Sequence, residues 1–454
     1  MSQPTDGGVA VVAAQLAAHQ ARLGWSVALA CPAFEDGPGA ATLDGPADSA
    51  GPHPSWLSRA AASGGARVLP WEATRSPGRT AFAEAGRLRD LIREVKPDLV
   101  HLHSSKAGLA GRLALRGSLP TVFQPHAWSF EAVTGPTRTA ALTWERWATR
   151  WTDVTVCVSV REQQDGERAG VHGAFTVVPN GVDPDVFTPG DRAEARAGLG
   201  LAGDRPLALV LGRLCPQKGQ DILLDAWPAV LDRVPDAQLA LVGDGPDRQT
   251  LADRIAADPR TAESVLLPGA TGDALSWYRA ADLLVVPSRW EGMALAPLEA
   301  MSCGCPVVAF EVAGIRESLP PHWAAGSLAA PGDGPALAAL VIRRLAETGG
   351  ADLASVPSGV PGTQEVSAAL GTPPALPGSA RPDGPVTPGT PDPVRTNAES
   401  GPIRAHGRVR THSAEARDWV LANHGIAQTA DAISDCYAEH LRGRISRLPQ
   451  GSNL

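Results

Sequence analysis

Long apolar runs and paired cysteines are both scarce in this sequence of 454 residues. No apolar run reaches the roughly 20 residues that a membrane-spanning helix needs, and the first residues, MSQPTDGG, lack the basic and apolar regions of a signal peptide. We therefore expect a cytoplasmic protein without a transmembrane segment. Hydrophobic residues make up 43% of the chain, which is enough to bury large cores, so we expect a soluble protein of two domains.

The sequence also gives little indication of a metal site or of a surface that binds polyanions. The cysteines are scattered, and Cys303 and Cys305 have no second pair at the spacing of a zinc site. Asp183 and Asp185 resemble a metal-binding Asp-x-Asp, but the Asn, Gly and Pro around them favour a turn. The formal net charge of −8 offers no broad basic surface. We expect reduced thiols, no bound metal and no nucleic-acid partner.

Lysine is nearly absent, and Lys96, Lys106 and Lys218 are the only lysines in a chain rich in Arg, Ala, Gly and Pro. A composition that replaces lysine with arginine makes each remaining lysine a candidate for a specific role. Lys96, in the segment REVKPD, is predicted to be a surface residue at a helix end. The presence of a lysine in this chain therefore does not by itself show a functional role. Lys106 and Lys218 each stand between an apolar strand and the start of a helix.

The strongest pattern lies in residues 281–310, ADLLVVPSRWEGMALAPLEAMSCGCPVVAF. Leu283–Val286 and Pro306–Phe310 predict two buried parallel strands with a loop and a short helix between them. Pro297 suits the first position of that helix, and Gly304 suits the position after its last turn.

This reading places Glu291 on the loop and Glu299 in the first turn of the helix. A helix N-terminus at the C-terminal edge of a parallel sheet directs N–H groups and a positive dipole toward a ligand. Two acids at such a position suit sugar hydroxyls or a cation. The alternative is that Glu299 complements the helix dipole and that Glu291 is a solvated loop acid.

A second cluster of charge follows the predicted strand LALVLGRL, in the loop and helix CPQKGQDILLDAW. Arg213 and Lys218 bracket this loop near a helix N-terminus. Arginine can donate two hydrogen bonds to phosphate oxygens, and lysine can act as a point charge. The two residues therefore predict a diphosphate-binding site, called here the diphosphate clamp. The alternative is a pair of ordinary surface charges.

The N-terminal half repeats strand ends that are followed by helices. A Gly7-Gly8 turn opens an apolar helical pattern that ends at Gly24. Residues 32–64 predict a long surface loop. Strands are predicted at Ser26–Ala30, Ala66–Pro70, Leu99–Leu102 and Pro120–Gln124, and the last of them leads to His126. This alternation predicts an α/β protein with doubly wound parallel sheets.

One helix, around ALTWERWATRW, carries Trp144, Trp147 and Trp151 on a single face beside Arg146 and Arg150. A basic aromatic helix can lie on a membrane surface. Because the chain is acidic overall and a strand follows directly, we expect this face to pack on the sheet.

Set together, these clusters resemble the retaining glycosyltransferases of family 4, which have the two-domain GT-B fold. The matching segments are VVPNGVD, GRLCPQKGQDILLDAW, LVGDGP and above all EGMALAPLEAMSCGCPVVAF, the E-x7-E segment of that family, with GGVA, HLHSSKAG and QPHAW agreeing in the first half. The resemblance implies two Rossmann-like domains that face a cleft. Residues 1–195 would form the acceptor-side domain, residues 196–430 the nucleotide-sugar domain, and residues 431–454 a helix that crosses back to the first domain.

The resemblance also implies roles for individual residues. Arg213 and Lys218 would hold the nucleotide diphosphate, Glu299 the ribose hydroxyls, and Glu291 with the backbone of Gly292, Met293, Ala294 and Leu295 the donor sugar and phosphates. Gly8 would let the backbone approach the phosphates, and His126 would lie near the transferred sugar. The implied reaction is retaining transfer from a UDP- or GDP-linked sugar to a hydroxyl of a saccharide, a lipid-linked molecule or a small molecule. Neither a metal nor a cofactor is implied, and peripheral contact with a membrane is compatible with it.

Two features depart from the family pattern. A short apolar strand should precede the Gly-Gly turn, yet only MSQPT stands before Asp6. We therefore expect Ser26–Ala30 and Leu99–Leu102 to flank a gap where the first strand is missing, because the start is late or the chain is a truncated relative. Residues 350–402, rich in Pro, Gly, Ser and Thr, read as a disordered insertion. The alternatives are a nucleotide-sugar-binding relative with impaired catalysis, and a sugar phosphorylase or epimerase on the same fold.

Overall fold

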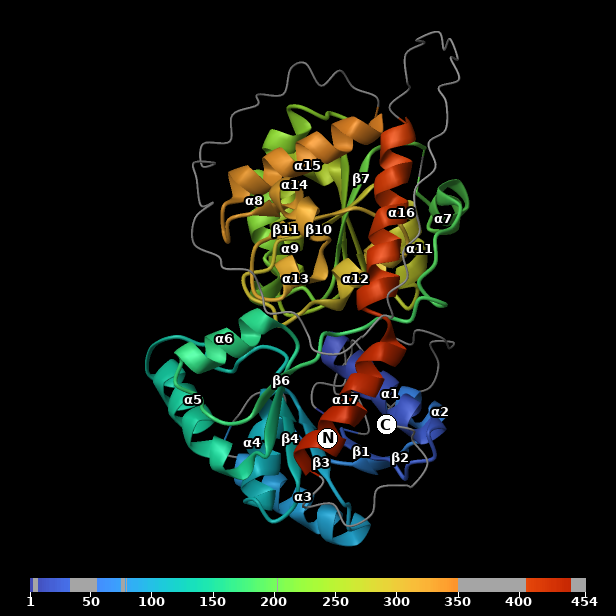
Figure 1. Ribbon diagram of the computed structural model, residues 1–454. Helices are drawn as coiled ribbons and strands as arrows, with labels where there is room; N and C mark the ends of the chain where they lie inside the picture. Colours follow the sequence, from blue (N-terminus) through green and yellow to red (C-terminus); the bar gives the residue numbers. More distant parts are fainter. Residues whose placement is uncertain are drawn as a thin grey trace, which may run out of the picture.

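The computed structural model describes residues 1–2, 7–32, 55–74, 78, 80–201, 203–349 and 406–441. These residues form two α/β halves, each built on parallel strands and covered by helices (Figure 1). This is the expected two-domain architecture. The predicted insertion, residues 350–402, lies outside the described residues.

The second half is built on one six-stranded parallel sheet in the order β12-β11-β10-β7-β8-β9. The central strands are apolar along their whole length and bury every residue of β10 and β11, because helices cover both faces. The strands are β7 (Leu207–Leu211), β8 (Gln238–Val242), β9 (Val265–Gly269), β10 (Leu283–Val286), β11 (Val307–Phe310) and β12 (Leu328–Ala329). The helices are α7 (Arg192–Gly198), α8 (Gln220–Leu231), α9 (Arg248–Ala256), α10 (Pro259–Ser264), α11 (Ala274–Ala280), α12 (Leu295–Ser302), α13 (Ile315–Ser318), α14 (Ala324–Ser327) and α15 (Gly334–Gly349).

The first half contains a four-stranded parallel sheet and a separate parallel pair. The sheet has the order β3 (Val100–His103), β4 (Thr121–Gln124), β5 (Val154–Cys157) and β6 (Phe175–Val177), and the pair is β1 (Ala28–Cys31) with β2 (Arg67–Pro70). The helices are α1 (Gly7–Arg22), α2 (Trp56–Ser63), α3 (Ala81–Val95), α4 (Ser104–Leu115), α5 (Gly135–Ala148) and α6 (Val160–Arg168).

Helix α2 corrects the prediction of an uninterrupted loop over residues 32–64. Ser55 caps this helix by accepting a hydrogen bond from the Ser58 N–H, and Leu57 and Ala61 are buried. The high content of Ala, Gly and Pro in this region favoured the prediction of a loop. The short amphipathic helix forms because tertiary packing stabilises it.

Strands β1 and β3 do not pair with each other, because Met1 and Ser2 lie between them. The Ser2 N–H donates to the Ala30 carbonyl at 3.0 Å, and the His103 N–H donates to the Met1 carbonyl at 2.9 Å. As expected, β1 and β3 therefore lie on either side of one strand position in the sheet. Met1 and Ser2 reach its C-terminal end and form a single bridge there.

The last two helices connect the halves. Helix α16 (His406–Asn423) packs on α12, and α17 (Ile426–Leu441) lies along α1 (Figure 1). The predicted boundary at residues 195–196 falls inside α7, which packs on α11. A boundary a few residues earlier fits these contacts better, and the division itself remains a prediction.

Candidate active site

Lys218 and Glu291 meet at the C-terminal ends of the adjacent strands β7 and β10. The Lys218 Nζ lies 2.6 Å from the Glu291 Oε1. The Glu291 side chain is 7% exposed, while that of Lys218 is 26% exposed. Gly219 permits this approach, since its φ is +66° and a Cβ there would lie 2.0 Å from the Pro287 carbonyl oxygen. The sequence predicted both residues at this edge but not their direct pairing.

Arg213 leaves the end of β7 beside the lysine. A Cβ on the preceding Gly212 would lie 3.6 Å from the Lys218 Cε, so the two cationic side chains start from neighbouring points. The Gln220 side chain donates to the Arg213 carbonyl at 3.0 Å and fixes this turn to the start of α8. The two predicted cations thus lie on one short loop.

Glu299 lies two residues further into α12 than expected. The helix begins at Leu295, so Pro297 is its third residue and Glu299 is not in the first turn. The Tyr278 hydroxyl donates to the Glu299 Oε2 at 2.6 Å. Burial raises the pKa of the Glu299 carboxyl above its usual value, and the hydrogen bond from Tyr278 opposes that shift. Tyr278, which the sequence did not single out, holds the orientation of this acid.

Gly292 lies directly against the first domain. A Cβ at Gly292 would be 2.8 Å from the His126 carbonyl carbon and 2.9 Å from the Ala127 nitrogen. The Ser159 hydroxyl donates to the Gly292 carbonyl at 3.2 Å, and the Asn180 side chain donates to the Met293 carbonyl at 2.8 Å. The loop after Glu291 is therefore held against the histidine of the other domain.

Two helix N-termini also face each other across this contact. A Cβ at Gly8, the second residue of α1, would lie 3.7 Å from the Leu295 side chain, the first residue of α12. Ala294 is the N-cap of α12 and has an extended backbone. Helix N-termini carry partial positive charge, so an anion would be stabilised near this contact.

His126 and Ala127 have φ values of 55° and 108°, a region that non-glycine residues rarely adopt. Glu162 holds this turn. Its carboxylate accepts hydrogen bonds from the Ala127 N–H at 2.6 Å and from the Val158 N–H at 2.7 Å, and its carbonyl accepts one from the Trp128 indole at 2.7 Å. Burial raises the pKa of Glu162 to about 7. Only the tertiary structure identifies Glu162 as a positioning residue, because it lies 35 residues from Ala127.

Three histidines stack next to the contact between the domains. The His126 Nε2 lies 3.1 Å from the His103 Nδ1, and the rings of His101 and His103 are 4.0 Å apart. Burial lowers the pKa of His126 to about 3 and holds the pKa values of His101 and His103 well below their usual range. At neutral pH His126 is therefore an uncharged hydrogen-bonding group and not a general acid.

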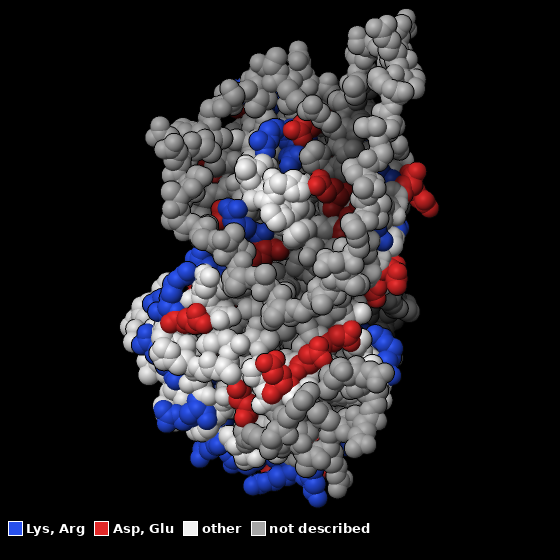
Figure 2. All heavy atoms as spheres, viewed as in Figure 1, with Lys and Arg blue, Asp and Glu red and all other residues white. Residues whose placement is uncertain are grey.

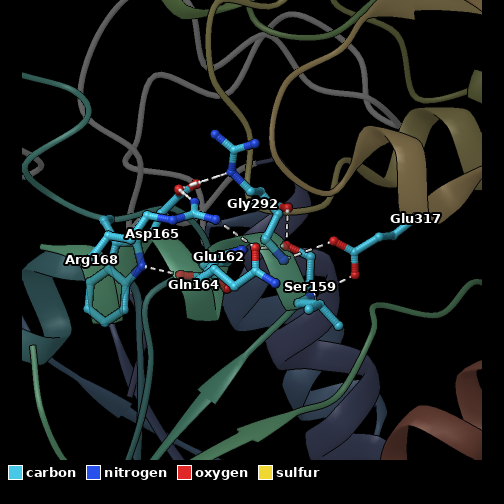
Figure 3. Close-up of polar contacts among 10 residues, drawn as sticks. Ser159, Glu162, Gln164, Asp165, Arg168, Gly292 and Glu317 are labelled. Carbon is cyan, nitrogen blue, oxygen red and sulfur yellow. Dashed lines mark hydrogen bonds and ion pairs between the residues drawn. The ribbon is translucent and has the colours of Figure 1, made fainter. Parts of the chain in front are cut away.

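A carboxylate of the second domain caps a helix of the first. The Glu317 side chain accepts hydrogen bonds from the Val160 N–H at 2.7 Å and the Arg161 N–H at 2.9 Å, at the N-terminus of α6 (Figure 3). Ser159 is the N-cap of the same helix and also contacts Gly292. This contact connects the two domains close to the Glu291 loop.

Two family models match the chain. The family described as Glycosyltransferase Family 4 matches residues 6–186, and that described as Glycosyl transferases group 1 matches residues 205–347. This chain belongs to glycosyltransferase family 4.

Among similar proteins, this chain is 32% identical to the Escherichia coli UDP-Gal:alpha-D-GlcNAc-diphosphoundecaprenol alpha-1,3-galactosyltransferase, over 50% of this chain and 61% of that protein. It is 42% identical to the Mycolicibacterium smegmatis GDP-mannose-dependent alpha-(1-6)-phosphatidylinositol monomannoside mannosyltransferase, over 33% of this chain and 42% of that protein. The chain thus spans about half the length of the curated relatives it matches. A solved structure of Anabaena HepE with UDP and glucose aligns with a TM-score of 0.67 and 19% identity, over 96% of this chain and 98% of that one.

Other expectations from the sequence have mixed outcomes in the structure. The six cysteines are buried and form no disulfide. Asp183 caps its own turn by accepting from the Asp185 N–H, as predicted. Lys106 forms an ion pair with Glu84 at 2.6 Å, and both side chains are buried, so it is a structural residue. The described residues contain no group of three His, Cys, Asp or Glu side chains placed to hold a metal ion.

The expectation that the tryptophan face of α5 packs on the sheet is wrong. Trp144, Trp147 and Trp151 contact one another, but none of them is fully buried and Trp147 is 39% exposed. Basic side chains gather on the outer edge of the first domain, where Figure 1 places α5 (Figure 2). Among the described residues, no helix has the length and apolar character to cross a membrane.

Proposed function

We propose that this protein transfers a sugar from a UDP- or GDP-linked donor to an acceptor hydroxyl, with retention at the anomeric carbon and without a metal ion. The observation that carries the proposal is the arrangement of side chains and helix ends at the contact between the two domains. The Lys218–Glu291 pair lies beside a loop whose Gly292 touches His126, and two helix N-termini face each other at Gly8 and Leu295.

The cations address the main chemical difficulty, which is the charge of the leaving group. As the glycosidic bond breaks, negative charge grows on the diphosphate, and Lys218, Arg213 and the N-terminus of α12 would stabilise it. The diphosphate would replace Glu291 as the partner of Lys218. Glu291 would then be free to accept hydrogen bonds from sugar hydroxyls.

The remaining groups position the substrates. Glu299, oriented by Tyr278, would accept from the ribose hydroxyls, and neutral His126 would hydrogen-bond the transferred sugar. The departing phosphate oxygen would take the proton of the acceptor hydroxyl on the same face of the sugar, so the mechanism needs no nucleophilic carboxylate. Closure of the domains through Glu317 and Ser159 would exclude water from the reaction.

We further propose a lipid-linked acceptor. The names of the two relatives above specify a diphosphoundecaprenol-linked and a phosphatidylinositol-linked acceptor. Trp144 and Trp147 of α5 and Trp151 just after this helix are partly exposed and lie next to exposed Arg146 and Arg150. This surface suits the interface of an anionic membrane. We expect the protein to work in the cytoplasm at such a surface.

A donor screen tests the proposal. Purified protein is incubated with UDP- and GDP-sugars and lipid extract, and products are identified by mass spectrometry and by the anomeric configuration of the new bond. A glycosylated lipid with retained configuration supports it. A requirement for inorganic phosphate would indicate a phosphorylase, release of free nucleotide with an epimerised sugar would indicate an epimerase, and nucleotide affinity without turnover would indicate a binding protein.

A further inference from the structure

The ion pair of Lys218 and Glu291 joins two loops that leave neighbouring strands of the second domain. Lys218 ends the short 3-10 turn Pro216–Lys218, which lies just before α8, and Glu291 lies in the loop that follows β10. Strands β7 and β10 pair as far as Leu209 and Leu284, before either strand ends. The relative position of the two loops therefore depends on contacts beyond the sheet.

Arg289 reaches from the second loop to the first. Its guanidinium donates to the Pro216 carbonyl at 2.7 Å and to both carboxylate oxygens of Asp221, at 2.8 and 2.7 Å. Pro216 precedes Lys218 in the 3-10 turn, and Asp221 follows it in the first turn of α8. A planar guanidinium that donates to both oxygens of a carboxylate fixes orientation as well as distance. Arg289 therefore holds the chain on both sides of Lys218.

Backbone groups add two more bonds between the same loops. The Arg289 N–H donates to the Gln217 carbonyl at 2.8 Å, and the Gln217 side chain donates to the Trp290 carbonyl at 3.0 Å. These bonds join the residue before Lys218 to the two residues before Glu291. The contacts that Arg289 and Gln217 make across the two loops are called here the Arg289 bridge.

The ion pair within the Arg289 bridge is charged at neutral pH but partly exposed. The hydrogen bonds from Arg289 hold the pKa of the Asp221 carboxyl below its usual value, and the same bonds raise the pKa of Arg289. Both side chains are 36% exposed. Exposed pairs add little to the free energy of folding, because water screens them and ordering their side chains costs entropy. The bridge is therefore better suited to fixing the position of the loops than to stabilising the domain.

Binding of a nucleotide diphosphate would leave the Arg289 bridge as a link between the loops. In the proposed function the diphosphate replaces Glu291 as the partner of Lys218, so the contact at 2.6 Å between them is lost. The bonds of the bridge would remain, because they involve neither of these two side chains. A lysine side chain is flexible, so its backbone must be held if the ammonium is to meet the phosphates. A misplacement of about 1 Å can cost on the order of 100-fold in rate.

We propose that Arg289 is a positioning residue for the donor: paired with Asp221, it keeps the two loops at a fixed separation. Lys218 then meets the diphosphate while Glu291 faces the sugar. This inference rests on the proposed function, because it takes a nucleotide diphosphate as the ligand of Lys218. Arg289 acts through the loops and not through contact with the nucleotide, since its guanidinium is bonded to Pro216 and Asp221. Its effect on nucleotide affinity should therefore depend on both Asp221 and Lys218.

Titration calorimetry with UDP and with GDP tests this proposal. It compares the unmodified protein with Arg289→Gln, Asp221→Asn, Lys218→Met and the double variant Lys218→Met/Arg289→Gln. We expect Arg289→Gln and Asp221→Asn each to weaken the affinity for the nucleotide that binds by about fivefold. The double variant should bind within about twofold of Lys218→Met, because the loop that the bridge positions no longer carries the ammonium.

Arg260→Gln is the matched control, because Arg260 also forms an exposed ion pair in the second domain. Its partner is Asp232 at 2.9 Å, and the two side chains are 55% and 63% exposed. This variant should bind the nucleotide as tightly as the unmodified protein. Urea unfolding of all variants separates positioning from folding, and Arg289→Gln should be as stable as Arg260→Gln.

Each of the following results would overturn the inference. If a nucleotide binds and Arg289→Gln binds it as tightly as the unmodified protein, the bridge does not position the loops. If Asp221→Asn keeps its affinity while Arg289→Gln loses it, Arg289 contacts the phosphates directly. If Arg289→Gln weakens binding equally with and without Lys218, its effect does not pass through Lys218. If the loss of affinity comes with a loss of stability relative to Arg260→Gln, the bridge is a structural contact only. Failure of the unmodified protein to bind either nucleotide would instead refute the proposed function, and with it the ligand on which the inference rests.

Discussion

The Lys218–Glu291 pair allows catalysis and stability to be separated. Replacing Lys218 with Met keeps an apolar side chain of similar length and removes the charge. Loss of one donor to a developing oxyanion costs ~3 kcal/mol in other enzymes. At about 1.4 kcal/mol per factor of ten, kcat/KM should fall on the order of 100-fold.

The same change should also lower stability, because Glu291 is left as a buried carboxylate without its partner at 2.6 Å. From the sequence alone, Lys218→Ala would be expected to leave thermal stability nearly unchanged, and the observed ion pair changes that expectation. Breaking a fully buried pair costs ~3–5 kcal/mol. Since the Lys218 side chain is 26% exposed and water reaches it, we expect a smaller loss of about 1–2 kcal/mol.

A second substitution isolates the two effects. The double variant Lys218→Met/Glu291→Gln removes the uncompensated charge, so its free energy of unfolding should return to within about 0.5 kcal/mol of the unmodified protein, while its activity should stay low. Arg260→Met is the matched control, because Arg260 and Asp232 form an ion pair at 2.9 Å with side chains 55% and 63% exposed. It should change neither property by more than about 0.5 kcal/mol.

Urea unfolding and initial rates at limiting and saturating donor measure these quantities. The clamp would be wrong if Lys218→Met kept full activity at both donor concentrations. The stability argument would fail if the double variant were as unstable as Lys218→Met. Recovery of activity in the double variant would mean that Lys218 serves only to neutralise Glu291.

Three further predictions concern metal, closure and pH. Activity should survive EDTA, and loss that a divalent metal restores would show that the cations do not suffice. Glu317→Gln should lower kcat/KM about fivefold, since weakening the cap of α6 by ~1 kcal/mol weakens the contact between the domains. Glu311→Gln, which affects a surface pair with Arg316, should leave kcat/KM unchanged. The free energy of unfolding should fall as pH drops below 6.5, because the unfolded histidines bind protons that buried His101 and His103 do not. At pH 5 each contributes a loss of ~2 kcal/mol, and a slope unchanged in His103→Gln would contradict this.

Much of the fold follows from local patterns. The apolar runs of β7, β10 and β11 predicted buried parallel strands because both faces of such strands are covered by helices. Their ends carry Arg213, Lys218 and Glu291, and the carboxyl ends of parallel strands meet at one edge of a sheet. The sequence alone therefore predicted that these residues lie close together.

Other predictions failed where packing decided the result. Helical spacing put Trp144, Trp147 and Trp151 on one face correctly, but spacing does not say what covers a face, and this one is partly exposed. The preference of proline for the first position of a helix predicted that α12 starts at Pro297, whereas the helix begins at Leu295. Pro is also tolerated elsewhere in the first turn, where its missing N–H costs nothing.

The sequence by itself determined the family, the strand ends and the residue types of the site. Only the tertiary structure decided how those residues are held. Tyr278 orients Glu299, Glu162 fixes the strained turn at His126, and Glu317 joins the domains. Each of these contacts joins residues at least 21 positions apart. Their energy depends on distance and burial in space, which local periodicity does not encode.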